Sequence, residues 1–343
     1  MDVAAILGIE STCDETAAAV VVEGRRVRSN IVATQFDLHA KYRGVVPEIA
    51  SRAHIQNILP VLREALDSAG LALGQIDAVA VAHRPGLIGS LLIGVTAAKA
   101  LAWSIHKPLI GVDHVHAHLY SVLLDGQADP EMPAVGMVVS GGHTALYRVA
   151  AMDEVALIGS TIDDAVGEAY DKVAAILGLG FPGGPILDAL AAEGDARAIA
   201  FPRSMLDRDS LDFSFSGLKT AVLYHVRGKQ GRQRTAADLT QQEIRDVAAS
   251  FQAACIDVLL TKVRRAVQQT QAGSVIVGGG VSANRGLRRS LAALGLPVYL
   301  PAAPYCTDNA AMTAGLAYLD FRRGRFSRLD LDAVTSSRFI REL

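Results

Sequence analysis

The fold is indicated by Ala134-Val-Gly-Met-Val-Val-Ser-Gly-Gly-His-Thr-Ala-Leu-Tyr-Arg-Val149, which consists of an apolar run, a short polar turn and a second apolar run. Valine-rich runs of this length, bounded by serine and glycine, predict two β-strands joined as a hairpin. The turn Ser140-Gly-Gly-His-Thr144 contains two glycines, which let the backbone approach an anion closely. The stretch therefore predicts a strand–turn–strand unit whose tip can bind an anion.

The beginning of the chain has the same layout. Ala4–Glu10 is an apolar run, Ser11–Thr16 is a polar turn, and Ala17–Val22 is a second apolar run. We interpret the two stretches as an internal duplication. They predict two similar α/β domains, each beginning with a hairpin whose loop faces a shared cleft.

Length and composition agree with two domains. A chain of 343 residues suits two domains better than one, and 50% hydrophobic with 20% charged residues permits a large core. The net charge is −2, and a negative net charge does not attract a nucleic acid, so any such contact must come from local basic patches. Two clusters are candidates, Arg285, Arg288 and Arg289 in one and Arg322, Arg323, Arg325 and Arg328 in the other.

The cysteines and the apolar runs bear on the cellular compartment of the protein. The three cysteines, Cys13, Cys255 and Cys306, form no Cys-x-x-Cys pair, so neither a disulfide framework nor a thiolate zinc site is predicted. The first residues lack the basic segment of a signal peptide, and no apolar run reaches the ~18 residues of a membrane span. We expect a cytoplasmic protein without a membrane contact.

Two histidines four residues apart, His114 and His118, follow the apolar run Pro108–Val112 directly. On a helix this spacing places both rings on one face, roughly 6 Å apart along the axis, where one metal ion can bind both. The alternative is a polar helix face or a buried, hydrogen-bonded histidine. The position after a strand favours a site, because ligands bind at the carboxyl ends of such strands.

Glycine-rich loops and acidic residues give further candidates. Gly278–Arg285 joins a strand to a helix and leaves an open surface for a flat base or ribose, with Asn284 placed to hydrogen-bond it. Ser160–Lys172 is expected to begin a helix whose first acidic residues favour its dipole. Asp171 lies too far along that helix for this role and is the better ligand candidate. A second loop, Arg84–Gly94, resembles a phosphate loop, although close helix–sheet packing also uses glycines.

Eight motifs in one order resemble the tRNA N6-adenosine threonylcarbamoyltransferase family, formerly described as O-sialoglycoprotein endopeptidases. The motifs cover nearly the whole chain: Gly8-Ile-Glu-Ser-Thr-Cys-Asp-Glu-Thr16, Gly44-Val-Val-Pro-Glu48, His114-x-x-x-His118, Val139-Ser-Gly-Gly-His-Thr144, Asp171-Lys172, Phe213-Ser-Phe-Ser-Gly-Leu-Lys219, Gly279-Gly-Val-Ser-Ala-Asn284 and Cys306-Thr-Asp-Asn309. The resemblance implies an α/β chain with the actin-like, sugar-kinase and Hsp70 ATPase fold, in which two duplicated domains surround a central cleft. We expect a first domain over 1–125, a second over 126–305, and a segment 306–343 that returns to the first.

The resemblance also implies the reaction. A threonylcarbamoyl group would pass from threonylcarbamoyl-adenylate to N6 of the adenosine 3′ of the anticodon, in tRNAs that read codons beginning with A. The implied partners are tRNA, the adenylate or another adenine nucleotide, a degenerate paralogue (TsaB-like) and a small ATPase (TsaE-like). The implied cofactor is one divalent metal ion per subunit, Fe(2+) in preference to Zn(2+).

Site residues follow from the same resemblance. It assigns the metal to His114, His118 and Asp308, and it assigns no catalytic residue. Substrate contacts are assigned to Val138, Val139, Ser140, Gly141, Gly142, Asp171, Gly184, Asp188 and Asn284. The chain departs from the family at Arg84, where glycine is common, and at His116 and Ala117, where glutamate and glycine are common.

Three alternatives have distinguishable signatures. A glycoprotein endopeptidase of the zincin type needs a glutamate after the first histidine, and Val115 occupies that position. A small-metabolite kinase of the same fold would not need the histidine pair. A nucleotide-gated scaffold would leave tRNA modification intact when a metal ligand is removed.

Overall fold

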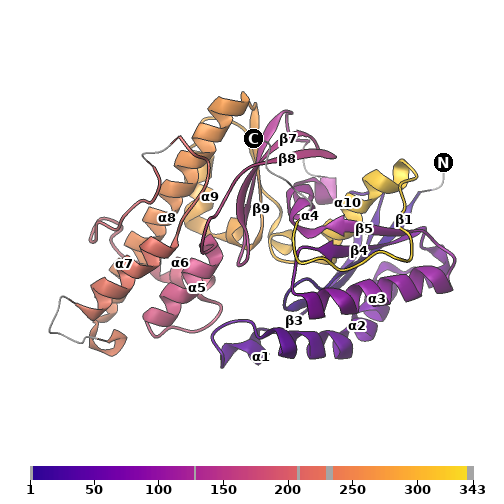
Figure 1. Ribbon diagram of the computed structural model, residues 1–343, viewed down its shortest axis with the longest axis horizontal. Coiled ribbons are helices and arrows are strands. Elements are labelled where there is room, and N and C mark those ends of the chain that lie inside the picture. Colours follow the sequence, from indigo (N-terminus) through magenta and orange to yellow (C-terminus); the bar gives the residue numbers. More distant parts are fainter. Residues whose placement is uncertain (1–2, 127–128, 207–208, 229–234, 338–343) are drawn as a thin grey trace. The chain divides into compact units, whose positions relative to one another are not determined.

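The computed structural model describes residues 3–126, 129–206, 209–228 and 235–337, and the chain forms two compact units (Figure 1). Unit 1 comprises Met1–His39, Val45–Asp129 and Pro301–Phe339, and unit 2 comprises Ala40–Gly44, Pro130–Leu300 and Ile340–Leu343. The end of the predicted segment 306–343 lies outside the described residues.

Unit 1 contains a five-stranded sheet in the order β3-β2-β1-β4-β5. Its strands are β1 (Ala5–Glu10), β2 (Glu15–Val22), β3 (Arg26–Thr34), β4 (Ala78–Arg84) and β5 (Leu109–Asp113). β1 and β2 form the predicted antiparallel hairpin, whereas β4 and β5 run parallel to β1. Every residue of β1 and β2 is buried, because helices cover both faces of the sheet.

Unit 2 repeats this topology in the order β10-β9-β6-β7-β8. Its strands are β6 (Ala134–Val139), β7 (Thr144–Ala151), β8 (Glu154–Ser160), β9 (Ser274–Gly278) and β10 (Val298–Tyr299). The β6–β7 and β7–β8 pairs are antiparallel, and the β6–β9 and β9–β10 pairs are parallel, as are their counterparts in unit 1. The predicted duplication is confirmed.

Helices from both ends of the sequence cover the sheet of unit 1. Its helical elements are α1 (Phe36–Ala40), α2 (Pro47–Ala69), η1 (Leu73–Gln75), α3 (Ile88–Ser104), α4 (His114–Tyr120), η2 (Ser121–Gly126), η5 (Ala303–Tyr305) and α10 (Ala310–Arg322). Leu7 and Ile9 pack with residues of α2 and α3, whereas Gly8, on the other face of β1, lies against α10 (Figure 1). A Cβ on Gly8 would lie 2.4 Å from the carbonyl oxygen of Ala310, so only glycine permits this approach.

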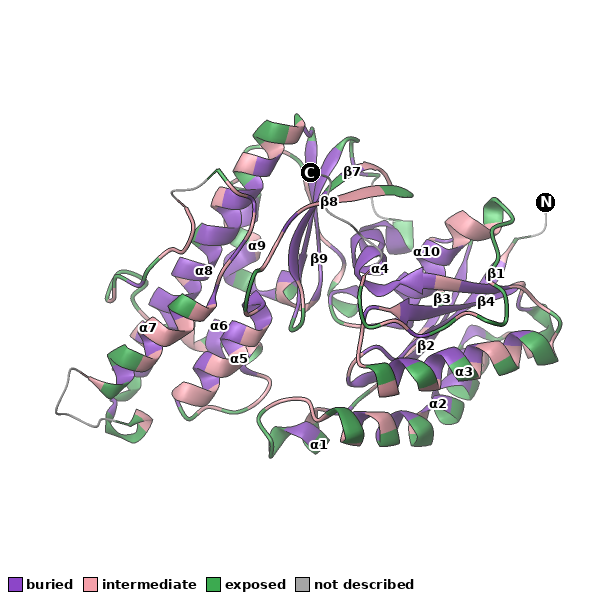
Figure 2. Cartoon of the chain, viewed as in Figure 1, coloured by how far each residue is buried: buried purple, intermediate pink, exposed green. Residues whose placement is uncertain are grey.

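The helical elements of unit 2 are α5 (Val166–Ile176), α6 (Gly183–Ala191), α7 (Ser216–Arg227), η3 (Ala236–Asp238), α8 (Gln241–Thr270), η4 (Gly280–Ala283) and α9 (Arg285–Ala292). α8 packs against β6 and β7, and its inward residues are buried along most of its length (Figure 2). The core also holds the fully buried rings of Phe213, Phe215 and Phe251. Among the described residues of the chain, no helix has both the length and the apolar character needed to cross a membrane.

One expectation about a helix start is wrong. The helix predicted from Ser160 begins at Val166, and the Asp163 carboxylate instead accepts hydrogen bonds from the backbone of Phe215 and Ser216 at the start of α7. The short η3 and the long α8 are separate elements, because Thr240 caps the start of α8 by accepting a hydrogen bond from the N–H of Glu243.

Candidate metal centre and substrate-binding residues

The strand-to-helix turn at Asp113 positions the two histidines. Asp113 ends β5 and caps α4, and its Oδ1 accepts hydrogen bonds from the N–H groups of Val115 (3.0 Å) and His116 (3.3 Å). His114 is therefore the first residue of the helix, and His118 lies one turn further on the same face. Both side chains are buried. His116, where the family commonly differs, is also buried but does not join the group described next.

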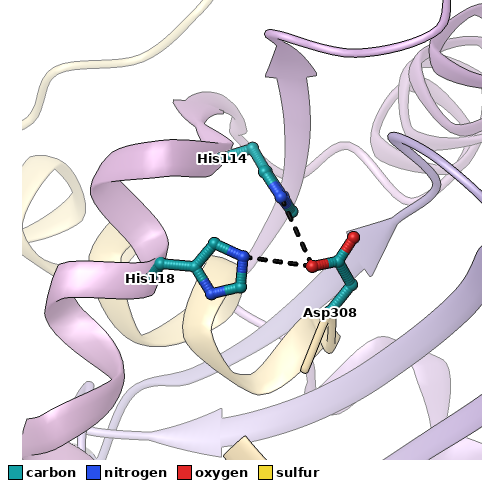
Figure 3. Close-up of side chains that lie close together, drawn as sticks. All are labelled: His114, His118 and Asp308. Carbon is teal, nitrogen blue, oxygen red and sulfur yellow. Dashed lines mark hydrogen bonds and ion pairs between the residues drawn. The ribbon is translucent and has the colours of Figure 1, made fainter. Parts of the chain in front are cut away.

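His114, His118 and Asp308 converge, and we call them the His–His–Asp group (Figure 3). Oδ1 of Asp308 lies 3.0 Å from Nε2 of His118 and 3.5 Å from Nε2 of His114. One potential ligand atom from each residue lies within 4.8 Å of the others. Asp308 immediately precedes Asn309, whose side chain caps α10 by accepting a hydrogen bond from the N–H of Met312. The start of α4 and the start of α10 thus meet, although 190 positions separate His118 from Asp308.

The two histidines differ electrostatically. Burial lowers the pKa of His118 below its ordinary value. Burial also lowers the pKa of His114, but the carboxylates of Glu10 and Asp308 together outweigh it and raise that pKa to about 9. Their negative charge favours a cation at this position. That cation is either the proton on His114 or a metal ion that replaces it.

The chemistry of the donor set fits a divalent transition-metal ion. Two imidazole nitrogens and one carboxylate oxygen are ligands that Fe(2+) and Zn(2+) both accept, and three protein ligands leave coordination positions open. Nδ1 of His114 lies 3.0 Å from Oε2 of Glu10, which leaves Nε2 for the metal. The group can therefore hold a metal ion.

The polar turn between β1 and β2 is occupied by contacts within the protein. The Thr12 N–H donates to Oε1 of Glu10 (2.9 Å), and the Ser11 hydroxyl donates to the carbonyl of Ser90 (2.9 Å). The glycine-rich loop after β4 packs on the same turn, because the N–H of Leu87 donates to the Thr12 carbonyl (2.8 Å). Nε of Arg84, the departure from the family pattern, donates to Nε2 of His83 (3.0 Å).

The corresponding turn of unit 2 is more open. Val138 and Val139 are buried at the end of β6, and Oγ of Ser140 accepts a hydrogen bond from the N–H of His143 (3.1 Å). Gly141 and Gly142 have no atom within 4 Å of the position where a Cβ would stand. Gly279 directly follows β9, the parallel neighbour of β6 in the sheet. It has φ +91° and lies against the carbonyl of Val139. The two predicted loops of unit 2 are therefore neighbours.

Asp171 and Gly184 lie near the start of α6. Oδ1 of Asp171 accepts a hydrogen bond from the N–H of Gly183 (2.7 Å), which joins α5 to the first turn of α6. Gly184, the next residue, has open space where a side chain would project. The structure thus places these two predicted residues close together.

Asp188 and Asn284 belong to one buried hydrogen-bond network with Gln252, which we call the Asp188 network. Nε2 of Gln252 donates to Oδ1 of Asp188 (3.2 Å), and Nδ2 of Asn284 donates to Oε1 of Gln252 (2.7 Å). Arg285 donates from Nε to Oδ2 of Asp188 (2.9 Å). Burial raises the pKa of Asp188, but the hydrogen bonds from Arg285, Gln252 and Gly286 lower it below its ordinary value.

Gln252 was missed by the sequence analysis. It lies in the middle of α8, and nothing in the neighbouring sequence distinguishes it from other polar residues of a long helix. Only the packing of α8 against α6 and α9 places it between Asp188 and Asn284.

Solved structures show the fold class. Component A of the (R)-2-hydroxyglutaryl-CoA dehydratase of Acidaminococcus fermentans matches 93% of this chain and 98% of its own, with a TM-score of 0.53 and 12% identity. HypF of T. kodakarensis matches 96% of this chain and 49% of its own, with a TM-score of 0.57 and 15% identity. The chain has the two-domain α/β fold of the actin-like, sugar-kinase and Hsp70 ATPase class.

Sequence relatives show the family. The model of the TsaD family, described as tRNA N6-adenosine threonylcarbamoyltransferase, matches residues 26–315. Proteins of that name from Moorella thermoacetica and Symbiobacterium thermophilum are 52% and 53% identical, each over 96% of this chain and 95% of the relative. The chain belongs to the tRNA N6-adenosine threonylcarbamoyltransferase family. It is a transferase that acts on tRNA, and the comparisons give no support to the endopeptidase or the kinase.

Proposed function

We propose that this transferase moves a threonylcarbamoyl group from threonylcarbamoyl-adenylate to N6 of the adenosine 3′ of the anticodon in tRNAs that read codons beginning with A. Membership of the family supports the transferred group and the acceptor atom. An exocyclic adenine amine is a weak nucleophile, so an activated mixed anhydride is a suitable donor. As the new bond between the carbamoyl carbon and N6 forms, the bond from that carbon to the phosphate oxygen would break, AMP would leave, and N6 would lose one proton.

The observation that carries the proposal is the convergence of His114, His118 and Asp308. We propose these three residues as the ligands of one metal ion, Fe(2+) in preference to Zn(2+). When bound, such an ion supplies an electrophile that polarises a carbonyl of the donor. The protein's part is to hold two imidazoles through α4 and one carboxylate through the start of α10.

The residues of unit 2 are proposed to bind the donor. Gly141 and Gly142 are exposed and have open space where a side chain would project, which suits the close approach of an anionic group of the adenylate. Asp171, Gly184, Asp188 and Asn284 are proposed to contact its remaining polar groups, together with Val138, Val139 and Ser140. Gln252 holds Asp188 and Asn284 in place through its side-chain hydrogen bonds to both. No residue is assigned as the general base.

We also propose the partners and the compartment that the family resemblance implied. These are a TsaB-like paralogue, a TsaE-like ATPase and the cytoplasm. The family's tRNA substrate supports this setting, since tRNA is modified there, and the local basic clusters are the proposed contacts.

Nucleoside analysis tests the reaction. The native protein is depleted in cells, which then receive the wild-type chain or Asp308→Ala, and tRNA nucleosides are measured by mass spectrometry. Wild type should restore N6-threonylcarbamoyladenosine, and Asp308→Ala should not. Asp330→Ala, which removes an exposed carboxylate of the same C-terminal segment, should restore it fully. Full modification with Asp308→Ala would refute the proposed role of this residue.

A further inference from the structure

A buried glutamate lies behind the His–His–Asp group. Glu10 is the last residue of β1 and is fully buried. Its Oε2 lies 3.0 Å from Nδ1 of His114 and accepts a hydrogen bond from the Thr313 hydroxyl (3.2 Å). Its Oε1 accepts a hydrogen bond from the N–H of Thr12 (2.9 Å). Both oxygens of this carboxylate are therefore engaged.

We infer that Glu10 is a positioning residue that fixes the ring of His114, with hydrogen on Nδ1, so that Nε2 points to the metal. The inference rests on the proposed metal ligands. A carboxylate only accepts hydrogen bonds, so the nitrogen that faces it must carry the hydrogen. The other nitrogen, 3.5 Å from Oδ1 of Asp308, then offers its lone pair to the metal ion that replaces the second ring proton.

Glu10 also connects the two segments that carry the ligands. Thr313 is on α10, five residues after Asp308, and it donates to the same carboxylate oxygen that His114 faces. β1, α4 and α10 thus meet at one side chain. A shift of Glu10 would move the ring of His114 relative to Asp308, and metal–ligand distances tolerate only about 0.2 Å.

An amide cannot replace this carboxylate. Glutamine offers one oxygen and one NH₂ group, whereas the surroundings present donors to both positions. If its oxygen faces His114, its NH₂ opposes the N–H of Thr12; if it is turned over, its NH₂ opposes the ring nitrogen. Glu10→Gln therefore keeps the volume but loses one of the two directed contacts.

His118 has no equivalent support. Among the described residues, its Nδ1 is buried without a hydrogen-bond partner, and its ring is oriented by the packing of α4 and by Asp308. A metal-binding histidine usually donates its other ring N–H to a carboxylate, a backbone carbonyl or a water, and removal of such an acceptor lowers metal affinity about 10–100-fold. Removal of the Glu10 carboxylate is thus expected to lower metal affinity measurably.

Metal affinity is measured by titrating the full chain with Zn(2+) in competition with a chromophoric chelator. We expect Glu10→Gln to bind Zn(2+) about 10–100-fold more weakly than wild type. Thr313→Val is the matched control, because it removes one donor to Glu10 but leaves the contact between Glu10 and His114. It should stay within about threefold of wild type, well below the expected loss for a partner of the ligand itself. Equal losses in both variants would indicate a general packing defect and overturn the inference.

Two further readouts separate the possible failures. In the Zn(2+)-loaded wild type labelled with ¹⁵N-histidine, NMR should show His114 bound through Nε2 with hydrogen on Nδ1. Binding through Nδ1 would overturn the inference even if Glu10→Gln does not fold. His114→Ala should lose Zn(2+) affinity. If it does not, the proposed metal ligands are wrong; if it does while Glu10→Gln binds normally, only the role of Glu10 is wrong.

Discussion

Replacement of Gly8 by alanine should disturb the metal centre by displacing α10, against which Gly8 packs. The new Cβ would lie 2.4 Å from the Ala310 carbonyl oxygen and 2.8 Å from the backbone nitrogen of Ala314. Ordinary contact begins at 3.4 Å, so the backbone of α10 must retreat by about 1 Å from β1. This overpacking should cost about 1–3 kcal/mol of unfolding free energy.

The same displacement should weaken metal binding. Asp308 immediately precedes the cap of α10, so a retreat of this helix carries the carboxylate away from the two histidines. We expect Zn(2+) affinity to fall at least about tenfold, because coordination distances tolerate only about 0.2 Å.

Urea denaturation and Zn(2+) titration measure the two effects on one preparation. Gly74→Ala is the control, because nothing lies within 4 Å of the new Cβ and its stability should change by no more than about 0.5 kcal/mol. The reasoning is refuted if Gly8→Ala matches wild type in both stability and Zn(2+) affinity.

Three other perturbations test separate parts of the molecule. Burial raises the pKa of Asp164, but Lys172 and Lys219 outweigh that effect and bring the pKa below its ordinary value. The ionised carboxylate therefore stabilises the fold above about pH 3.9, and this contribution is lost as the pH falls through the lower pKa of the folded state. Asp164→Asn should therefore cost about 0.5–1 kcal/mol at pH 7 in urea denaturation, and an equal cost at pH 2 would contradict this. Asp188→Ala and Asn284→Ala should weaken binding of an adenylate analogue in calorimetry while the circular dichroism spectrum is kept; unchanged affinity in both would remove them from the donor site. Charge reversal of the two arginine clusters should weaken tRNA binding and flatten its salt dependence, and an unchanged salt slope would exclude both clusters as tRNA contacts. The clusters are Arg285, Arg288 and Arg289, and Arg322, Arg323, Arg325 and Arg328.

The central strands could be predicted because they are buried on both faces and their sequences are continuous apolar runs. β1, β2, β6 and β7 were found in this way, and their repeated layout indicated the duplicated fold. The edge strands β3 and β8 were not predicted. One residue of each is buried, and β3 mixes polar with apolar residues, whereas β8 is apolar only over its four residues 155–158. Helix starts were misplaced where a carboxylate caps a distant helix, as Asp163 does for α7.

The candidate site was predictable only in part for a similar reason. The spacing of His114 and His118 is a local signal, whereas Asp308 entered through the family resemblance, since 190 positions separate it from His118. Gln252 gave no signal, and Glu10 lies in one of the eight motifs but received no role from it. Each is a single polar residue in an otherwise ordinary strand or helix, and its partners come from elements remote in the sequence.

Metal content and affinity of Asp308→Ala, measured beside wild type and Asp330→Ala, test the proposed metal site most directly. We expect one Zn(2+) or Fe(2+) ion per chain in wild type and in Asp330→Ala, and loss of that ion from Asp308→Ala while its circular dichroism spectrum remains that of wild type. An Asp308→Ala chain that binds one ion with wild-type affinity would contradict the claim that His114, His118 and Asp308 hold the metal together.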